Sequence, residues 1–236
     1  MFLKSQLAFL MKTHVNHKQI RHVSLKRIGT WYSSLVKPKN AGPPYKHIVQ
    51  IGDPILRSPA DKVPADLIKS EEISLLIKLM KKVLKLHECV GLSAPQIGVP
   101  LQIFLMEFNE KHAKLYDERE FKNKEMSLQP QTVIINPEIK IIDYKKVVYS
   151  ESCGSVKGLY ADVPRFKSVL LKGLDESGKP IELTRSGWIA RIIQHEMDHL
   201  NGILYTDIME RKSLTCGCWN VINERGGKVE LPYGPV

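Results

Sequence analysis

The sequence predicts an α+β fold, with short antiparallel sheets packed around one buried central helix and an amphipathic helix nearer the N-terminus. Three observations support this class. Only two segments sustain a helical spacing of apolar residues, and several short apolar runs are separated by turn-forming residues. The chain has 236 residues, enough for one domain with a sizeable core. Few helices among several short strands are typical of α+β domains.

The start of the chain differs in charge from the rest. No acidic residue precedes Asp53, whereas nine Lys or Arg do, and the remainder carries 26 basic against 25 acidic residues. A basic, acid-free start with apolar residues at Leu3, Leu7 and Leu10 is typical of a mitochondrial transit peptide. We therefore expect residues 1–44 to be a transit peptide and linker, and the protein to act in the mitochondrial matrix. The alternative is a basic arm that binds nucleic acid, but the nearly neutral body counts against it, so no nucleic acid is expected for the mature domain.

The body shows its expected elements in order. Residues 66–89 place apolar side chains at helical spacing with lysines between them, which indicates an amphipathic surface helix. Residues 109–131 are polar and charged without an apolar period, and predict a loop or insertion. No apolar run reaches the roughly 18–20 residues of a membrane span, so no membrane-spanning helix is expected. Strands are expected at residues 101–108, 132–142, 145–149, 168–173 and 181–184.

Residues 188–201 predict a buried helix that carries a His-Glu-x-x-His motif. Apolar residues cover nearly all faces of this segment, as in a helix inside a core. His195, Glu196 and His199 are then polar groups in an apolar interior, which is costly unless each has a partner. Because His195 and His199 lie four apart on one helix face, they can bind the same metal ion.

The third ligand decides what kind of site the motif builds. One family of metalloproteases extends it to HExxHxxGxxH. Here Gly202 matches the glycine, but Tyr205 replaces the third histidine. Glu210 and Glu224 follow in a stretch without a strong helical pattern, so a metalloprotease stays an alternative with an incomplete site. Cys153, in the segment SESCGSV, is the other candidate, because a thiolate and two imidazoles leave the ion acidic enough to activate water.

Three motifs stand in the order found in peptide deformylases: Gly91-Leu-Ser-Ala-Pro-Gln96, Glu151-Ser-Cys-Gly-Ser155 and Gln194-His-Glu-Met-Asp-His199. Over about residues 46–212 the chain resembles this family, specifically its mitochondrial type. The resemblance implies a catalytic domain at residues 45–212. Residues 213–236 are then a C-terminal extension of unknown role.

The resemblance also implies a reaction and a metal. Cys153, His195 and His199 would bind one divalent ion, Fe²⁺ or Zn²⁺, with water in the fourth position. The enzyme would remove the formyl group from the N-terminal formylmethionine of newly synthesised proteins. Its partners would be N-formylmethionyl nascent peptides, and a homodimer is compatible with the sequence. A weakly active family member is a further alternative.

Four residues receive roles from the resemblance. Glu196 would take a proton from the attacking water and pass it to the leaving amine. The Gln96 side-chain amide and the Gly154 backbone N–H would donate hydrogen bonds to the developing oxyanion. The Gly91 carbonyl would accept from the substrate N–H, and Gly154 would also border the substrate. Bacterial forms have leucine where Gly154 stands, so a side chain that would line the methionine pocket is missing.

Other polar residues receive structural interpretations. Asp198 and Arg165 are expected to form a charge pair rather than to act on substrate. The four cysteines show no repeated CxxC pairs and suit a reducing compartment. Cys216 and Cys218 are interpreted as ordinary thiols, because no second cysteine pair lies nearby to complete a structural zinc site.

Overall fold

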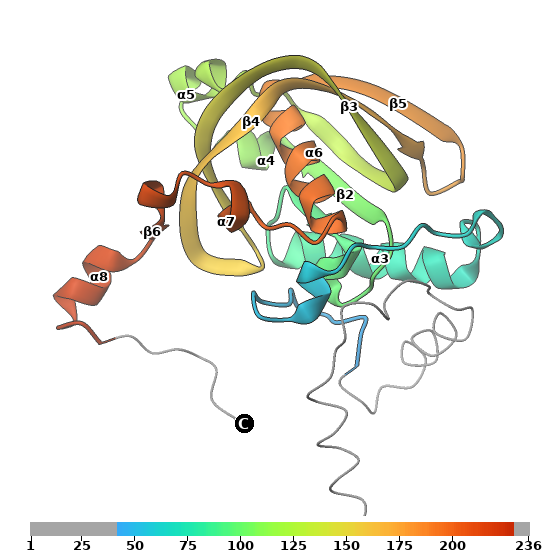
Figure 1. Cartoon of the computed structure of the whole chain (residues 1–236), viewed down its shortest axis with the longest axis horizontal. Helices are drawn as coiled ribbons and strands as arrows, with labels where there is room; N and C mark the ends of the chain where they lie inside the picture. The colour runs from blue at the N-terminus through green and yellow to red at the C-terminus, as the bar shows by residue number, and fades with distance from the viewer. Residues whose placement is uncertain (1–41, 229–236) are drawn as a thin grey trace, which may run out of the picture.

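The computed structural model describes residues 42–228 of the chain. The expected transit peptide at residues 1–44 therefore lies almost entirely outside the described residues, as do residues 229–236 of the C-terminal extension. Figure 1 shows a curled sheet wrapped around a central helix, with a second long helix beneath it. Among the helices of residues 42–228, none is long and apolar enough to cross a membrane.

One antiparallel sheet of six strands forms the framework. The first five are hydrogen-bonded in chain order, and the last pairs with the edge of the fourth. They are β1 (Gly91–Ser93), β2 (Ile103–Phe108), β3 (Gln129–Cys153), β4 (Val156–Leu174), β5 (Pro180–Ser186) and β6 (Thr215–Cys216). Because β1 to β5 are paired in chain order, this part of the sheet is a meander. The predicted α+β class is confirmed.

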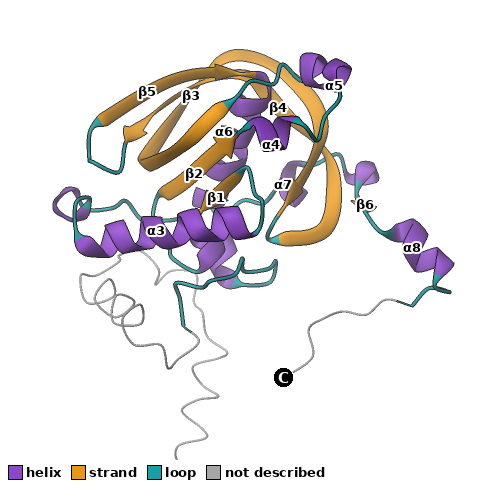
Figure 2. Ribbon diagram, turned by 180° about the vertical axis from the view of Figure 1, so that it is seen from behind, coloured by secondary structure: helices purple, strands orange, loops and turns teal. Residues whose placement is uncertain are grey.

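The prediction of several short sheets needs correction. β3 has 25 residues and β4 has 19, and the two form one long bent hairpin that encloses the central helix (Figures 1 and 2). The segments expected as separate strands at 132–142 and 145–149 are parts of β3. Register shifts follow Ile141 and Asp143. Such bulges bend a strand and interrupt its alternation, so in the sequence they look like a strand end.

The central helix is α6 (Gly187–Leu200), which begins directly after β5. It packs against β4, β1, β2 and β5, and ten of its fourteen residues are buried. The helix ends at a turn in which Ile203 N–H donates to the Asp198 carbonyl at 2.9 Å. Gly202 in this turn has φ +73°, and a Cβ there would lie 2.7 Å from the backbone of Arg57. The close approach and the left-handed conformation both require glycine.

The amphipathic helix is α3 (Glu71–Leu86), which the Ser70 hydroxyl caps by accepting from the Ile73 N–H at 3.3 Å. Along β2, Ile103 and Leu105 belong to the same core cluster as α3, whereas Phe104 packs with α6. Alternate residues of a strand point to opposite faces. The β1–β2 end of the sheet therefore separates two apolar cores, with α3 on one side and α6 on the other.

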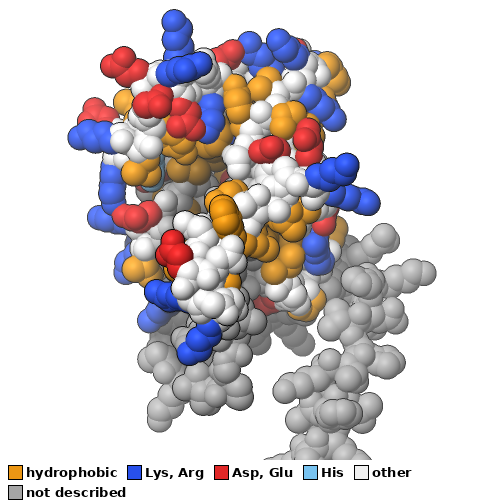
Figure 3. Space-filling model, turned by 90° about the vertical axis from the view of Figure 1, so that its left-hand side faces the viewer, with side chains coloured by type: hydrophobic (Ala, Val, Ile, Leu, Met, Phe, Trp, Pro, Cys, Tyr) orange, Lys and Arg blue, Asp and Glu red, His pale blue; other side chains and the backbone are white. Residues whose placement is uncertain are grey.

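The expected loop at 109–131 contains two short helices, α4 (Glu110–Ala113) and α5 (Glu118–Asn123), so this prediction was wrong in detail. The Asn109 and Asp117 side chains cap their first turns. Helices this short are set by capping rather than by apolar spacing, which is why periodicity missed them. The remaining helical segments are η1 (Pro54–Arg57), η2 (Ala65–Leu67), η3 (Ala94–Ile97), α7 (Tyr205–Ile208), η4 (Arg211–Ser213) and α8 (Trp219–Glu224). On the face in Figure 3, basic and acidic side chains are interspersed.

Candidate active site

Three potential metal ligands meet inside the curl of the sheet. Cys153 ends β3 at the tip of the β3–β4 hairpin, and His195 and His199 lie on successive turns of α6. The Cys153 Sγ is 3.2 Å from the His199 Nε2, and one ligand atom from each residue lies within 4.8 Å of the others. The hairpin thus brings a residue 42 positions away in sequence onto the His-Glu-x-x-His face of the helix.

The three residues fit a divalent metal ion. Burial opposes ionisation of Cys153, but the charge of His199 and hydrogen bonds from both histidines lower the pKa of the thiol well below its ordinary value. One thiolate and two imidazoles are a donor set for zinc or ferrous iron, with a fourth position left for water or substrate. Among the described residues, the Glu196 Oε2 is buried without a hydrogen-bond partner, as a group that serves a bound water would be.

Glu151 orients the first histidine. Its Oε2 lies 3.0 Å from the His195 Nδ1, which leaves the Nε2 to face Cys153. A carboxylate behind a ligating histidine fixes the ring and raises its basicity. Burial opposes ionisation of Glu151, but hydrogen bonds from His195 and Arg165 outweigh it and hold the pKa of this carboxyl well below its usual range. The carboxylate is therefore charged, although it is almost fully buried.

Two arginines neutralise this buried carboxylate. Arg165 donates to both oxygens of Glu151, at 2.9 Å each, and Arg191 donates to the Oε1 at 2.6 Å. Arg165 also forms the expected ion pair with Asp198. Arg191 further donates to the Val163 carbonyl at 2.8 Å. This buried network, defined as Glu151, Arg165, Arg191, His195 and Asp198, joins α6 to the long hairpin that carries Cys153.

Glu196 is buried beside the metal ligands. The side chain is 3% exposed, and burial raises the pKa of its carboxyl to about 7. Gly91 on β1 lies directly against it: a Cβ at this position would be 2.2 Å from the Glu196 Oε1. Any side chain at residue 91 would therefore displace the carboxylate. The glycine of the first motif is explained by this approach, a reason that the sequence alone does not give.

Gln96 has two hydrogen-bonding duties. Its Oε1 accepts from the Ser93 backbone N–H at 2.9 Å, which closes a capping box at the start of η3. Its Nε2 is thereby turned toward the Cys153 Sγ at 3.6 Å and the Ser155 Oγ at 3.3 Å. The loop that Gln96 stabilises also aims its donor at the site.

Gly154 follows the cysteine, and the space that a side chain would need there is taken. A Cβ at this position would lie 2.8 Å from the Ile48 Cδ1 and 3.8 Å from the Cys89 Sγ. The Gly154 carbonyl accepts from the Gln50 Nε2 at 2.8 Å. Ile48 and Cys89 are therefore the neighbours that a side chain at residue 154 would meet.

A cavity of about 620 Å³ opens from Gly154 and Cys89 toward solvent, with Tyr45, His47 and His87 at its border. The sequence did not indicate Tyr45, His47 or His87 as site residues. Tyr45 and His47 stand in the first few residues of the domain, where no periodic signal exists. Arg191 was also missed, although a charged residue in a helix apolar on nearly every face is itself a signal that it has a buried partner.

The match to known proteins decides the family. The polypeptide deformylase family model matches residues 45–214. The chain belongs to this family. It is 40% identical over 182 residues to the mitochondrial peptide deformylase of Homo sapiens, which covers 77% of this chain and 75% of that protein. To the chloroplastic peptide deformylase 1A of Solanum lycopersicum it is 41% identical, covering 76% of this chain and 64% of that protein.

Solved structures give the same result. The peptide deformylase of Synechococcus elongatus in complex with actinonin matches with a TM-score of 0.58 and 32% identity, covering 81% of this chain and 91% of that one. A Met-Ala-Ser-bound class I type b peptide deformylase from Acinetobacter baumannii matches with a TM-score of 0.61 and 28% identity, over 69% and 96%. The predicted resemblance is confirmed, and the chain is a peptide deformylase, a metal-dependent hydrolase. This assignment replaces the metalloprotease alternative.

Proposed function

We propose that this peptide deformylase removes the formyl group from the N-terminal formylmethionine of proteins newly made in mitochondria. The observation that carries the proposal is the placement of Glu196 and Gln96 beside the Cys153, His195 and His199 ligand set. The compartment is supported by the acid-free basic leader and by the likeness to a mitochondrial peptide deformylase. The homodimer stays a prediction.

Cys153, His195 and His199 would hold one divalent ion, and both Zn²⁺ and Fe²⁺ suit one thiolate with two imidazoles. When bound, such an ion lowers the pKa of a water molecule and polarises a carbonyl oxygen. Glu151 keeps the His195 ring in place for this purpose, because its Oε2 accepts a hydrogen bond from the His195 Nδ1–H, with 3.0 Å between oxygen and nitrogen.

Glu196 acts as the general base and then as the general acid. Its carboxylate accepts a proton from the water that attacks the formyl carbon, and delivers that proton to the nitrogen of the departing methionine amine. Burial, which raises the pKa of this carboxyl to about 7, makes the group suited to both transfers near neutral pH. Gly91 leaves room for the carboxylate. We assign the Gly91 carbonyl as the acceptor for the substrate N–H.

The oxyanion that forms on the formyl oxygen needs donors. The Gln96 Nε2 supplies one, because the Oε1 is held by the Ser93 N–H and the amide cannot turn without losing that bond. The Gly154 backbone N–H supplies the other. Loss of one donor of this kind costs about 10²–10³ in turnover, so Gln96→Leu is expected to slow formate release by that factor.

The test is formate release from a formyl-Met peptide by the metal-loaded protein. Glu196→Gln keeps the size of the side chain but cannot take the proton, and formate release is expected to fall about 10²–10⁴-fold. Metal content, measured in parallel, should be unchanged in Glu196→Gln and lost in Cys153→Ala. Glu182→Gln, a surface replacement of the same kind, is the matched control.

Unchanged formate release by Glu196→Gln would remove Glu196 from its role. Removal of the metal with a chelator, followed by addition of Fe²⁺ or Zn²⁺, tells which ion restores activity. For the compartment, import into isolated mitochondria is compared between the full chain and a chain without residues 1–44. Equal import of both would contradict the transit peptide.

A further inference from the structure

The two C-terminal cysteines lie in a defined place rather than on a loose tail. Cys216 belongs to β6, which pairs with the edge of β4, and its register partner is Leu159. The next residue continues the attachment, because the Gly217 N–H donates to the Gly158 carbonyl at 2.9 Å. The Cys-Gly-Cys segment is therefore held against the long hairpin by backbone hydrogen bonds.

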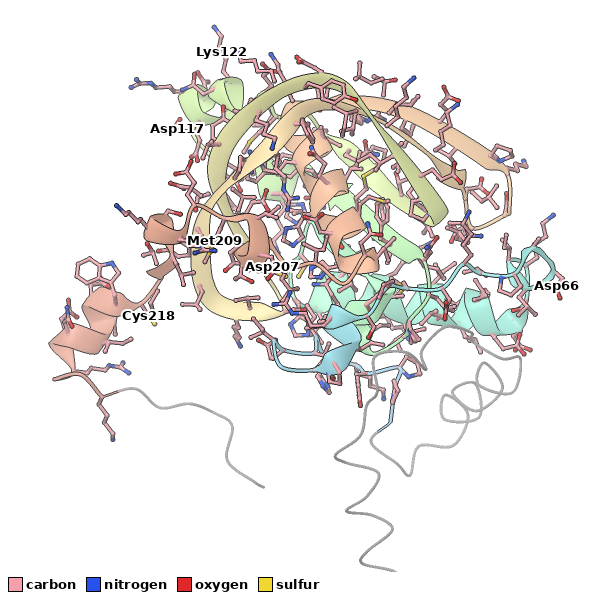
Figure 4. All side chains as sticks on the ribbon, viewed as in Figure 1. Asp66, Asp117, Lys122, Asp207, Met209 and Cys218 are labelled. Carbon is pink, nitrogen blue, oxygen red and sulfur yellow. The ribbon has the colours of Figure 1, made fainter. Side chains whose placement is uncertain are left out.

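Gly217 allows a close approach that sets the geometry of the pair. A Cβ at this position would lie 2.8 Å from the Cε1 of the Tyr160 ring. The chain turns over this ring, and the turn places the Cys218 Sγ 3.5 Å from the Cys216 Sγ. Cys218 is exposed and Cys216 is half-buried. Figure 4 shows Cys218 at the start of α8, outside the curled hairpin and away from α6.

The other two cysteines have different surroundings. Cys153 is buried among the metal ligands, and Cys89 borders the cavity beside Gly154. Neither belongs to the Cys216–Cys218 pair. The exposed Cys218 thiol and the half-buried Cys216 thiol thus lie next to each other, and the proposed deformylation uses neither.

We propose that Cys216 and Cys218 form a redox-active thiol pair that closes to an intramolecular disulfide by exchange with a small-molecule disulfide such as oxidised glutathione. The S–S bond of a disulfide is about 2.05 Å long, so the sulfurs need to approach by about 1.5 Å from their present separation. Cys218 lies at the start of α8, with one residue between it and β6. The approach is a movement of side chains, whereas β6 is held to β4 by backbone hydrogen bonds.

The exchange has two balanced steps. One cysteine thiolate attacks oxidised glutathione, which forms a mixed disulfide and expels one glutathione thiolate. The second cysteine, after losing its proton to solvent, attacks the protein sulfur of that mixed disulfide and expels the other glutathione. The two protein thiols are oxidised and one glutathione disulfide is reduced to two thiols. The product ties the start of α8 to β6 and so to the edge of β4.

The experiment equilibrates the full-length, metal-loaded protein in glutathione buffers of increasing oxidised fraction. Free thiols are blocked with N-ethylmaleimide, and disulfides are then reduced and labelled with iodoacetamide. The protein is digested, and the masses of its peptides are measured by mass spectrometry. The peptide with Cys216 and Cys218 is expected to lose the mass of two hydrogen atoms before reduction, and to carry the second label on both sulfurs. The hydrogen bond to Cys216 raises the pKa of Cys218, and thiolates are the attacking species, so closure is expected to speed up as pH rises.

Variants separate ring closure from simple modification. Cys216→Ser and Cys218→Ser each leave one thiol, which is expected to retain a bound glutathione, since the resolving sulfur is gone. Cys89→Ser keeps the pair and is expected to close as the wild type does. Formate release by Cys216→Ser and Cys218→Ser reports that the domain is folded, and thermal unfolding reports it for Cys89→Ser, which borders the active-site cavity. The proposal is overturned if both thiols stay alkylated by the first reagent in every buffer. It is equally overturned if the wild type carries two glutathiones or a cross-link between copies instead of the closed ring.

Discussion

Ion pairs between a basic side chain and a glutamate occur in this protein in two opposite settings, one buried and one exposed to solvent. In the buried network, Arg165 and Glu151 expose 4% and 5% of their side chains and lie 2.9 Å apart. On the surface of the sheet, Lys172 of β4 and Glu182 of β5 lie 2.8 Å apart but expose 54% and 60%. The distances are nearly equal, so what differs is the solvent around the charges.

Exposure to solvent determines how much the buried network and the surface pair each contribute to stability and geometry. A buried charge loses its hydration and is tolerable only when neighbours replace it with charge and hydrogen bonds. Glu151 has three such neighbours, and each holds it in one orientation. An exposed pair keeps its water, gains little from pairing and fixes no geometry. We therefore expect the buried network to position the metal ligands, and the surface pair to be nearly dispensable.

The largest effect is expected from Glu151→Ala. This change leaves two guanidinium groups buried without their carboxylate, which typically costs about 3–5 kcal/mol in the free energy of unfolding. It also frees the His195 ring, so metal affinity is expected to fall about 10–100-fold. Urea denaturation and a competition assay with a metal-binding dye measure the two effects. Glu182→Ala is the matched surface control, and equal effects of both changes would contradict the assigned role of the network.

A smaller loss is expected from Arg165→Lys. Lysine keeps the positive charge but lacks the planar fork that reaches both oxygens of Glu151. One or more buried acceptors lose a donor, which costs about 1–3 kcal/mol in the free energy of unfolding. Arg185→Lys is the control, because Arg185 bonds the neutral Gln129 in a half-buried position. A loss no larger than that of Arg185→Lys would show that charge alone suffices at residue 165.

The pH dependence of stability sharpens the comparison further. The pKa of Glu151 is lowered from its ordinary 4.5 in the folded protein. Its ionised form therefore stabilises the fold at any pH above about 4.5, and this contribution is lost as the pH falls below that value. Glu151→Gln does not titrate at this position. The free energy of unfolding of wild type minus variant should thus shrink as the pH falls below about 4.5. A difference that stays constant in acid would contradict the lowered pKa.

The smallest effect is expected from Lys172→Met. The exposed pair with Glu182 is worth about 0–1 kcal/mol. Residue 172 lies near the end of β4, where that strand pairs with β5, whereas Cys153 lies before the start of β4. Thermal unfolding and formate release should both stay close to the wild type. A loss as large as that of Arg165→Lys would mean that exposure is a poor guide to the importance of an ion pair here.

The sequence by itself determined the two long helices, the family motifs and the candidate ligands. α3 and α6 were predictable because apolar spacing and the burial of His195 and His199 are local properties of one segment. Cys153 could be named as a candidate, and the resemblance completed the set. The cap residues of α4 and α5 were visible too, at Asn109 and Asp117, but no apolar period drew attention to them.

Only the tertiary structure decided how these parts meet. The register shifts that make β3 one bent strand depend on its pairing with β4, and that bend carries Cys153 to α6. The need for glycine at residue 91 depends on a carboxylate that is 105 positions later in the sequence. The two arginines on Glu151 come from β4 and α6. A periodic pattern reports which face of an element is buried. What that face meets is set by contacts between segments far apart in the chain.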